Sequence, residues 1–174
     1  MTRSLYIVGA PATGKSTLMA QLLTGWEVGP HDSWGPHISG HYLRHPKHGH
    51  GVYIGHLRPE YPGTDALSLR VYPYAVRWLE TLPLLGLDWV LGEGIRLGFV
   101  RFLETLAQAT DLTLVHLEVP AEETRRRRIA RGGKLQTEGF CRSAVTKAAN
   151  VADYCREAGI PVLDGEGARR ALGS

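Results

Sequence analysis

Cysteine is scarce in this sequence, since Cys141 and Cys155 are the only two among 174 residues. Two cysteines exclude a disulfide framework and indicate a reduced, cytoplasmic setting. Long hydrophobic runs are also missing and the N-terminus has no signal pattern, so we expect no membrane partner. Charge of one sign is in small excess, because 20 Lys and Arg against 17 Asp and Glu leave a net charge of +3. This mild basicity suits anionic ligands, but it does not by itself indicate nucleic-acid binding.

One motif dominates what the sequence does contain. Residues 9–16 read Gly-Ala-Pro-Ala-Thr-Gly-Lys-Ser and fit G-x-x-x-x-G-K-S, the phosphate-binding loop of nucleoside triphosphate enzymes. Apolar residues predict a buried strand over about 5–9 before the loop and a helix to about Leu23 after it. This setting favours a phosphate site over an ordinary glycine-rich turn, because loop amides and a helix N-terminus together attract an anion.

The motif also assigns roles to individual residues. We expect Lys15 to reach the β- and γ-phosphates and the Ser16 hydroxyl to hold Mg²⁺, so ATP and Mg²⁺ are the expected cofactors. Adenine rather than guanine is the default donor base. The residues expected to bind the nucleotide are Gly9, Ala12, Thr13, Gly14, Lys15, Ser16 and Thr17.

The rest of the chain alternates strand and helix patterns. This alternation predicts a single α/β domain over residues 1–174, with a parallel five-stranded sheet flanked by helices. Residues 26–36 are rich in Gly, Pro and Trp and are expected to form a loop, whereas β-like runs around a turn predict an inserted β-hairpin at about 37–57. The other buried strands are predicted over about 5–9, 87–91, 112–119 and 160–163. The phosphate loop, Glu93 and Asp164 should then meet at the carboxyl edge of the sheet.

Two classes of phosphate-loop protein are excluded. Regulatory GTPases need a guanine-reading N-K-x-D motif, which the chain lacks, and AAA-type ATPases need additional subdomains for which it is too short. Four features match small kinases: the loop at 9–16, a strand over 87–93 that ends in an acid, an arginine-rich helix after residues 114–123, and the closing residues 158–164. The chain therefore resembles the nucleoside and nucleotide kinase group, which implies a P-loop kinase-like three-layer sandwich.

A second resemblance concerns the acceptor of the phosphate. Residues 55–68 read Gly-His-Leu-Arg-Pro-Glu-Tyr-Pro-Gly-Thr-Asp-Ala-Leu-Ser, which looks like a stretch in small kinases of bacteriophages. Some of those kinases are thought to act on hydroxymethylated pyrimidines in DNA. This resemblance implies that the acceptor could be a modified base within DNA, and a role in DNA modification.

Phosphoryl transfer depends mainly on positioning and on neutralising charge. Besides Lys15, we expect catalysis to involve Glu93, which ends a buried strand between two glycines. Its carboxylate could hold the water shell of Mg²⁺ or accept the acceptor's proton, or it could be a turn acid. The resemblance implies an arginine-rich lid over 120–139, in which Arg127 and Arg131 share one helix face. The alternative for these arginines is a solvated basic surface.

Residues 26–65 are expected to form an insertion on the acceptor side. Within them, Asp65 is a candidate base or binder of the acceptor hydroxyl, although Thr64 or Asp65 could simply cap the following helix. Arg58 is a candidate for an acceptor phosphate. Arg96 lies three residues after Glu93 and could pair with it or contact an acceptor phosphate.

Seven of the eight histidines lie between residues 31 and 56. No cysteine or well-placed acid completes a zinc site with them, so we expect no metal there. These histidines could offer hydrogen bonds to the acceptor or to a nucleic-acid backbone, or they could be ordinary surface polarity.

Together the residues predict an ATP-dependent kinase. The expected acceptor is a nucleoside, a nucleotide or a hydroxymethylated pyrimidine in DNA, so its partners would be a small nucleotide-type molecule or DNA. Two alternatives stay open: a kinase of another small alcohol, and a nucleotide-binding regulatory module with slow hydrolysis. The sequence does not indicate an oligomeric state.

Overall fold

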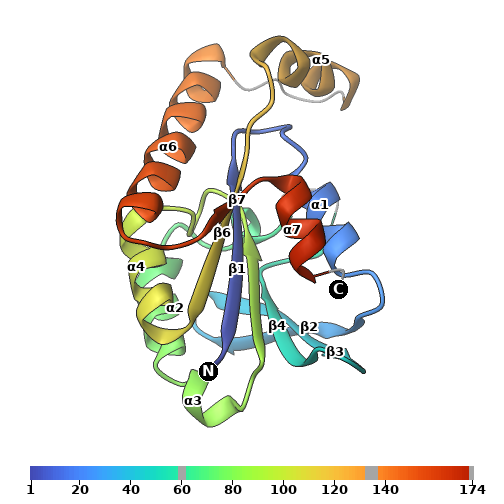
Figure 1. Cartoon of the computed structure of the whole chain (residues 1–174), viewed down its shortest axis with the longest axis vertical. Helices are drawn as coiled ribbons and strands as arrows, with labels where there is room; N and C mark the ends of the chain where they lie inside the picture. The colour runs from blue at the N-terminus through green and yellow to red at the C-terminus, as the bar shows by residue number, and fades with distance from the viewer. Residues whose placement is uncertain (59–61, 132–136, 173–174) are drawn as a thin grey trace.

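One mixed sheet organises the computed structural model of the chain (Figure 1). The structure describes residues 1–58, 62–131 and 137–172. The strands are β1 (Arg3–Gly9), β2 (Glu27–Gly35), β3 (Ile38–His45), β4 (Gly49–Ile54), β5 (Trp89–Glu93), β6 (Asp111–Leu117) and β7 (Val162–Leu163). Within the described residues they form a seven-stranded sheet in the order β2-β3-β4-β5-β1-β6-β7.

The sheet has a parallel part and an antiparallel part. Strands β4, β5, β1, β6 and β7 pair in parallel, whereas β2 and β3 extend the sheet by antiparallel pairing beyond β4. The predicted parallel α/β sheet is confirmed, but the predicted number of five strands is wrong for the whole sheet, which has seven in the described chain. The hairpin expected at about 37–57 corresponds to β3 and β4, and it continues the main sheet because β4 pairs with β5.

The prediction of a loop at 26–36 is wrong, because most of these residues form β2. This strand lies at the edge of the sheet and most of its residues are exposed, including Asp32 and Ser33. It also contains Pro30, which an edge strand tolerates because one side of its backbone has no partner strand. An exposed edge strand needs no apolar alternation, so the pattern that reveals buried strands was missing.

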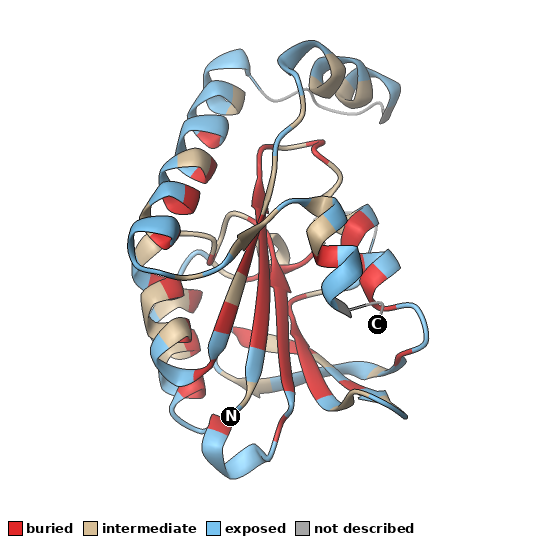
Figure 2. Ribbon diagram, viewed as in Figure 1, coloured by how far each residue is buried: buried red, intermediate tan, exposed pale blue. Residues whose placement is uncertain are grey.

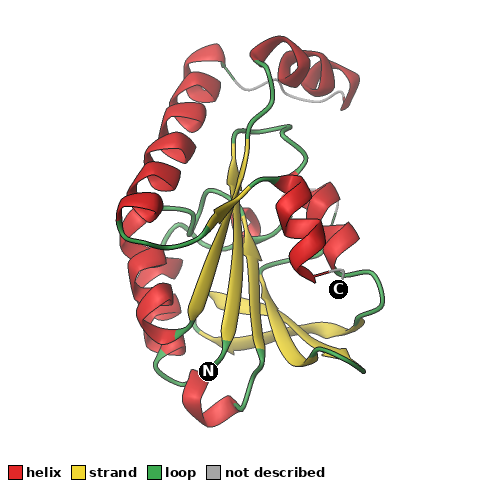
Figure 3. Cartoon of the chain, viewed as in Figure 1, coloured by secondary structure: helices red, strands yellow, loops and turns green. Residues whose placement is uncertain are grey.

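Helices cover both faces of the sheet (Figure 3). Thr137 caps the N-terminus of the 20-residue helix α6 (Glu138–Glu157), because its hydroxyl accepts a hydrogen bond from the amide of Phe140 at 3.2 Å. The helices are α1 (Lys15–Leu22), α2 (Val71–Leu79), α3 (Leu82–Leu85), α4 (Val100–Ala109), α5 (Ala121–Arg131), α6 (Glu138–Glu157) and α7 (Gly165–Leu172), with a short 3₁₀ helix η1 (Thr64–Ala66).

Strand β1 divides the core into two apolar layers. Because successive side chains of a strand point to opposite faces, Leu5 and Ile7 pack with α1 and α7, whereas Tyr6 and Val8 pack with α2, α4 and α6. All of these β1 side chains are buried, and Figure 2 shows the buried residues concentrated in the central strands. Burying an apolar side chain of this size contributes about 1.5–3 kcal/mol, so β1 is held firmly between the two layers.

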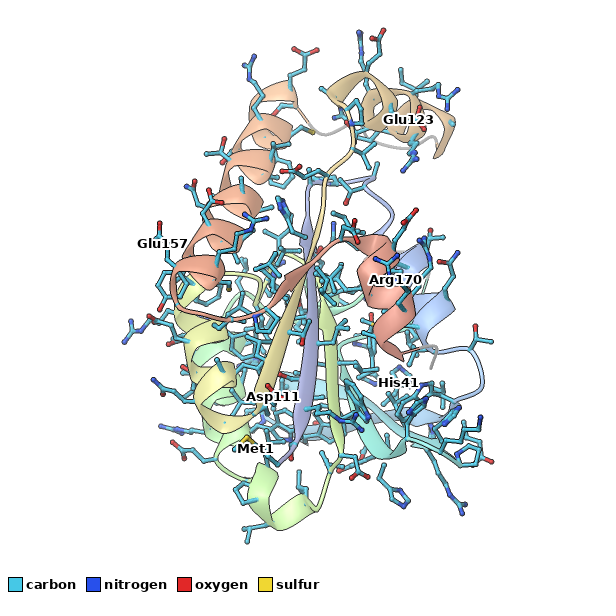
Figure 4. All side chains as sticks on the ribbon, viewed as in Figure 1. Met1, His41, Asp111, Glu123, Glu157 and Arg170 are labelled. Atoms are coloured by element: carbon cyan, nitrogen blue, oxygen red, sulfur yellow. The ribbon has the colours of Figure 1, made fainter. Side chains whose placement is uncertain are left out.

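The carboxyl ends of β1, β5 and β6 meet at one edge of the sheet. In Figure 1 this edge points upward, toward the loop that follows β1 and toward α5 above it. Figure 4 labels Glu123 on α5 near this end and Asp111 at the start of β6, farther down. Among the described residues, the helices are too short or too polar to cross a membrane.

Candidate active site

The loop after β1 is shaped as a cradle for an anion. Gly14 has φ +94° and Ala12 has φ +65°, so both residues adopt left-handed backbone conformations. A Cβ at Gly9 would lie 2.7 Å from Oγ1 of Thr13 and 2.8 Å from a backbone carbonyl of β6, so only glycine fits there. The buried Thr13 hydroxyl donates a hydrogen bond to the carbonyl of Ala10 at 2.9 Å, which ties the loop to itself. Ala12 thus has a backbone conformation that non-glycine residues rarely adopt, and such conformations are concentrated at functional sites.

The first turn of α1 offers further groups to a phosphate. The Nζ atom of Lys15 donates hydrogen bonds to the carbonyls of Gly9 and Ala10 at 3.0 Å each, so the ammonium group lies over the loop. Gly14 precedes the helix without capping it by a side chain, which leaves the amides of the first turn directed at the loop. Ser16 and Thr17 supply hydroxyls in the same turn. Amides, an ammonium group and a hydroxyl are the donor set that suits a nucleoside triphosphate with Mg²⁺.

Glu93 joins the end of β5 to this loop. Its Oε2 atom accepts a hydrogen bond from the Ser16 hydroxyl at 3.0 Å, and its Oε1 atom accepts one from the Tyr53 hydroxyl at 2.9 Å. Glu93 is buried, with 1% of the residue exposed. Burial raises the pKa of this carboxyl, whereas the hydrogen bonds from Tyr53 and Ser16 and the charge of Lys15 act in the opposite direction. The structure thus brings together Ser16 and Glu93, the two residues predicted to hold Mg²⁺.

Asp65 lies beside Glu93 and shapes the loop that follows β5. Its Oδ1 atom accepts hydrogen bonds from the amides of Ile95 and Arg96 at 2.7 and 3.0 Å. The neighbouring Thr64 is fully buried, and its hydroxyl donates to the carbonyl of Glu93 at 2.9 Å. Neither side chain caps the short helix η1. Asp65 therefore reaches the predicted site, and there it binds backbone of the β5 loop instead of capping a helix.

The two arginines expected to bind the acceptor differ in their surroundings. Arg96 is half-buried, and its Nε atom is buried without a hydrogen bond to any group in the described part of the chain. A buried donor without a partner is costly, so an anion beside Arg96 would relieve that cost. Arg58 is exposed and follows β4, where its charge lowers the pKa of His31 and His56, although burial is the larger cause for both histidines.

One arginine of α5 reaches the phosphate loop. The Nη1 atom of Arg127 approaches the carbonyl of Ala12 at 3.5 Å, and its Nε atom donates to Oε1 of Glu123 at 2.7 Å. Glu123 also pairs with Arg126 at 2.7 Å, and these hydrogen bonds lower the pKa of its carboxyl. Arg131 ends α5, and its side chain lies outside the described residues, as do residues 132–136 of the predicted lid at 120–139. The structure thus places Arg127, which the sequence singled out, over the loop.

A cleft of about 610 Å³ separates the phosphate loop from α5 and α6. Its lining includes Ala10 and Pro11 of the loop and the charged residues Glu122, Arg125, Arg128, Glu138 and Arg142. Positive side chains beside a phosphate loop would stabilise the charge that develops during phosphoryl transfer.

Tyr53 belongs to this site although the sequence did not single it out. It is fully buried on β4, and its hydroxyl donates to the carboxylate of Glu93. Its position follows from the register, since Tyr53 pairs with Leu91 across the parallel strands and therefore shares a face with Glu93, two residues later. The alternation of apolar and polar residues predicted β4 as a strand, but it did not predict that β4 pairs with β5. The contact between Tyr53 and Glu93 could therefore not be predicted from the sequence.

Comparison with known proteins bears on the identity of this site. A family model described as P-loop Nucleotide Kinase3 matches residues 1–167. The chain belongs to this family. Membership of the P-loop nucleotide kinases supports a phosphotransfer of the kinase type and confirms the predicted resemblance to small phosphate-loop kinases. Such kinases generally use ATP and Mg²⁺. The narrower resemblance of residues 55–68 to kinases of bacteriophages stays a prediction.

A solved structure extends this comparison. The P-loop nucleotide kinase described here is similar to a sugar kinase from Janibacter sp. HTCC2649, whose crystal structure is unliganded, with a TM-score of 0.52 and 13% sequence identity. The match covers 99% of this chain and 90% of that chain, and it confirms the P-loop kinase-like α/β fold. No curated protein matches the chain by sequence.

Proposed function

We propose that this chain transfers the γ-phosphate of ATP, bound with Mg²⁺, to a hydroxyl group of a nucleoside, a nucleotide or a hydroxymethylated pyrimidine in DNA. The observation that carries the proposal is the 3.0 Å hydrogen bond between Ser16 and Glu93, which links the phosphate loop to the end of β5. If Mg²⁺ binds, the Ser16 hydroxyl would be a ligand of the ion and Glu93 would hold its water shell. When bound, Mg²⁺ would neutralise charge on the β- and γ-phosphates.

The carboxylates of Glu93 and Asp65 have different roles in the proposed reaction. Both oxygens of Glu93 accept hydrogen bonds, from Tyr53 and Ser16, so its carboxylate is fixed in orientation and suits the metal's water shell. Asp65 has one oxygen occupied by backbone amides, and its Oδ2 atom accepts no hydrogen bond from the described residues. We therefore assign Asp65 to the acceptor hydroxyl. As the acceptor oxygen bonds to the γ-phosphorus and the bond to the bridging oxygen breaks, the hydroxyl proton passes to Asp65 Oδ2.

Cations surround the position of the transferred group. Lys15 and Arg127 approach it from the loop and from α5, and Arg131 would join them from the end of that helix. Arg96 would bind an anionic group of the acceptor, because its buried Nε atom lacks a partner among the described residues. Arg58 would contact the acceptor from the segment after β4.

A second candidate is phosphorylation of a different small alcohol. The similarity in fold to a protein named as a sugar kinase favours this candidate, and the proposed roles of Glu93 and Asp65 would serve any hydroxyl. What distinguishes the candidates is the acceptor, so the experiment must vary it.

The test incubates the protein with Mg²⁺, γ-labelled ATP and separate acceptors: deoxynucleosides, deoxynucleoside monophosphates, hexoses, and DNA with and without hydroxymethylpyrimidines. We expect label to move to one nucleotide-type acceptor, with Lys15→Ala losing the transfer and Lys47→Ala keeping it. Lys47 is the matched control because it is an exposed lysine in the turn between β3 and β4.

Other outcomes would redirect the assignment. Transfer to a hexose would replace the proposed acceptor by the second candidate. Release of the label only as inorganic phosphate, at one slow rate with every acceptor, would identify a nucleotide-binding regulatory module. Unaltered transfer by Lys15→Ala would contradict the role of the phosphate loop.

A further inference from the structure

The histidines of residues 31–56 separate into two groups in the structure. Close to the carboxyl edge, the rings of His31 and His56 are stacked with their centroids 3.8 Å apart. The centroid of the His41 ring lies 5.3 Å from that of His31. At the other end of the hairpin, His45 and His48 are stacked 4.4 Å apart. We call the residues His31, His41 and His56 the histidine cluster; Figure 4 labels His41 on the antiparallel side of the sheet.

The histidine cluster is physically connected to the active site. The ring of His41 lies 6.4 Å from that of Tyr53, whose hydroxyl donates to Glu93. The backbone of His56 pairs with Gly63 through hydrogen bonds of 3.1 and 2.8 Å. Gly63 packs so closely on Glu93 that a Cβ added to it would lie 2.5 Å from Glu93 Cγ. A molecule with its reacting hydroxyl at Asp65, beside Glu93, could therefore extend across β4 to the cluster.

The chemistry of the cluster suits an anion and not a metal ion. In the part of the chain that the structure describes, no three His, Cys, Asp or Glu residues are arranged to hold a metal. Within the same residues, no carboxylate forms an ion pair with the cluster or with Arg58, and Asp32 is the one acid whose charge acts on His31. The fixed positive charge beside these imidazoles thus comes from Arg58, opposed at His31 by Asp32.

Two of the three imidazoles, those of His31 and His56, also have hydrogen-bonding capacity left. His41 Nδ1 donates to the carbonyl of Gly29 at 2.9 Å and its Nε2 atom accepts from the amide of Leu57 at 3.5 Å, so both nitrogens of that ring are occupied and its orientation is fixed. His31 Nε2 lies 3.1 Å from the Ser39 hydroxyl. Neither ring nitrogen of His56 has a hydrogen bond to another described residue. An anion bound here would meet donors whose positions are largely set beforehand.

We propose that the histidine cluster and Arg58 form a phosphate-binding subsite, which holds a phosphate group of the acceptor away from the hydroxyl that reacts. The proposal rests on the proposed function, because the subsite positions an acceptor whose hydroxyl reacts at Asp65. The ligand chemistry is a phosphate ester, either the monoester of a free nucleotide or a diester of a polynucleotide. Stacked rings beside an arginine give both charge and a flat surface for such a ligand.

Protonation gives the subsite a signature of its own. Burial and the neighbouring positive groups lower the pKa of His31 and of His56, so without a ligand both rings are neutral at neutral pH. A bound phosphate favours the charged rings and so raises the pKa of each histidine. Binding of a diester, whose own charge does not change in this range, should therefore strengthen as the pH falls from about 8 to about 6.

The first test follows the histidine ring signals by NMR while MgADP occupies the phosphate loop. Inorganic phosphate, a deoxynucleoside monophosphate and a short oligodeoxynucleotide are added in separate titrations. We expect saturable shifts of the signals of His31, His41 and His56 and little change at His45 and His48, which serve as internal controls. Stronger binding of the oligonucleotide would identify a polynucleotide source, and stronger binding of the monophosphate a free nucleotide. Equal small shifts of all five histidines would overturn the proposal.

The second test separates this subsite from the proposed function itself. The double variant His31→Asn/His56→Asn should raise KM about tenfold for a phosphate-bearing acceptor, as expected for the loss of charge-assisted hydrogen bonds, and leave KM for the unphosphorylated nucleoside unchanged. The control His45→Asn/His48→Asn should change neither. An equal rise in KM for both acceptors would overturn the subsite. The NMR titration detects binding without turnover. The phosphate-binding subsite can therefore be refuted while the kinase activity is confirmed, and the kinase activity can be refuted while the subsite is confirmed.

Discussion

The hydrogen bond between Tyr53 and Glu93 leads to a prediction about a single oxygen atom. The substitution Tyr53→Phe removes the hydroxyl that lies 2.9 Å from Oε1 of Glu93 and keeps the ring. Because Tyr53 is fully buried and Glu93 is 1% exposed, no bulk water can replace the lost donor. A hydrogen bond to a charged group contributes about 1.5–3 kcal/mol, so we expect the variant to lose about 2 kcal/mol of unfolding free energy when Glu93 is ionised.

The same reasoning fixes the dependence on pH. The Tyr53 hydrogen bond favours the ionised carboxylate and so works against burial, which raises the pKa of Glu93. Its stabilising effect is present above the pKa of Glu93 in the folded protein and is lost as the pH falls through that pKa. The variant should therefore be destabilised more at about pH 8 than at about pH 5. Burial of the carboxyl by itself lowers stability with rising pH in both proteins, so it largely cancels from the comparison.

Urea unfolding of both proteins at the two pH values measures this difference, and the melting temperature at the higher pH should fall by about 4–8 °C. In the kinase assay, the acid limb of the pH profile of kcat/KM should move to higher pH, because Glu93 then needs a higher pH to ionise. An equal loss of stability at both pH values, with an unchanged acid limb, would refute the argument that Tyr53 acts through the charge of Glu93.

Three further predictions concern the same edge of the sheet. Gly63→Ala should lower the free energy of unfolding by more than about 2 kcal/mol, because a Cβ there meets Glu93. Gly86 has a similar φ but nothing within 4 Å of an added Cβ, so Gly86→Ala should lower it by only about 1 kcal/mol. Urea unfolding of both variants measures the difference. Asp65→Asn keeps an oxygen that can accept from the two amides, so the free energy of unfolding should change little. The variant loses the proposed base, so kcat should fall at least about a hundredfold. An unchanged kcat would limit Asp65 to a structural role. Arg127→Ala should lower kcat about tenfold or more, whereas Arg126→Ala, whose exposed side chain pairs with the same glutamate, should leave it unchanged in steady-state assays.

The donor side of this site could be predicted because short-range physics determines it. The G-x-x-x-x-G-K-S spacing specifies a local backbone shape, and Lys15 and Ser16 occupy fixed places within it. Glu93 was also found, since the end of a buried parallel strand must face the ligand edge. These inferences need only residues that are close in sequence or a general rule of α/β topology.

The acceptor side depends on contacts between distant segments. Tyr53 lies 40 residues from Glu93, and Asp65 binds amides about 30 residues away, so neither contact leaves a local pattern. Strand β2 was missed for another reason, since an exposed edge strand is not selected for apolar alternation. The register of β4 against β5 decides which side chains reach Glu93, and the sequence alone does not set that register.

The bridge between His56 and Gly63 has a consequence for engineering the protein. It closes the base of the segment that joins β4 to η1, while Gly55 and Gly63 cross so closely that a Cβ on Gly55 would lie 2.0 Å from the carbonyl oxygen of Gly63. A replacement segment grafted between these two anchor points would leave the contacts of Thr64 and Glu93 in place. On the proposed function, in which Arg58 of this segment contacts the acceptor, a library of loops on this base should change acceptor preference without altering the phosphate loop.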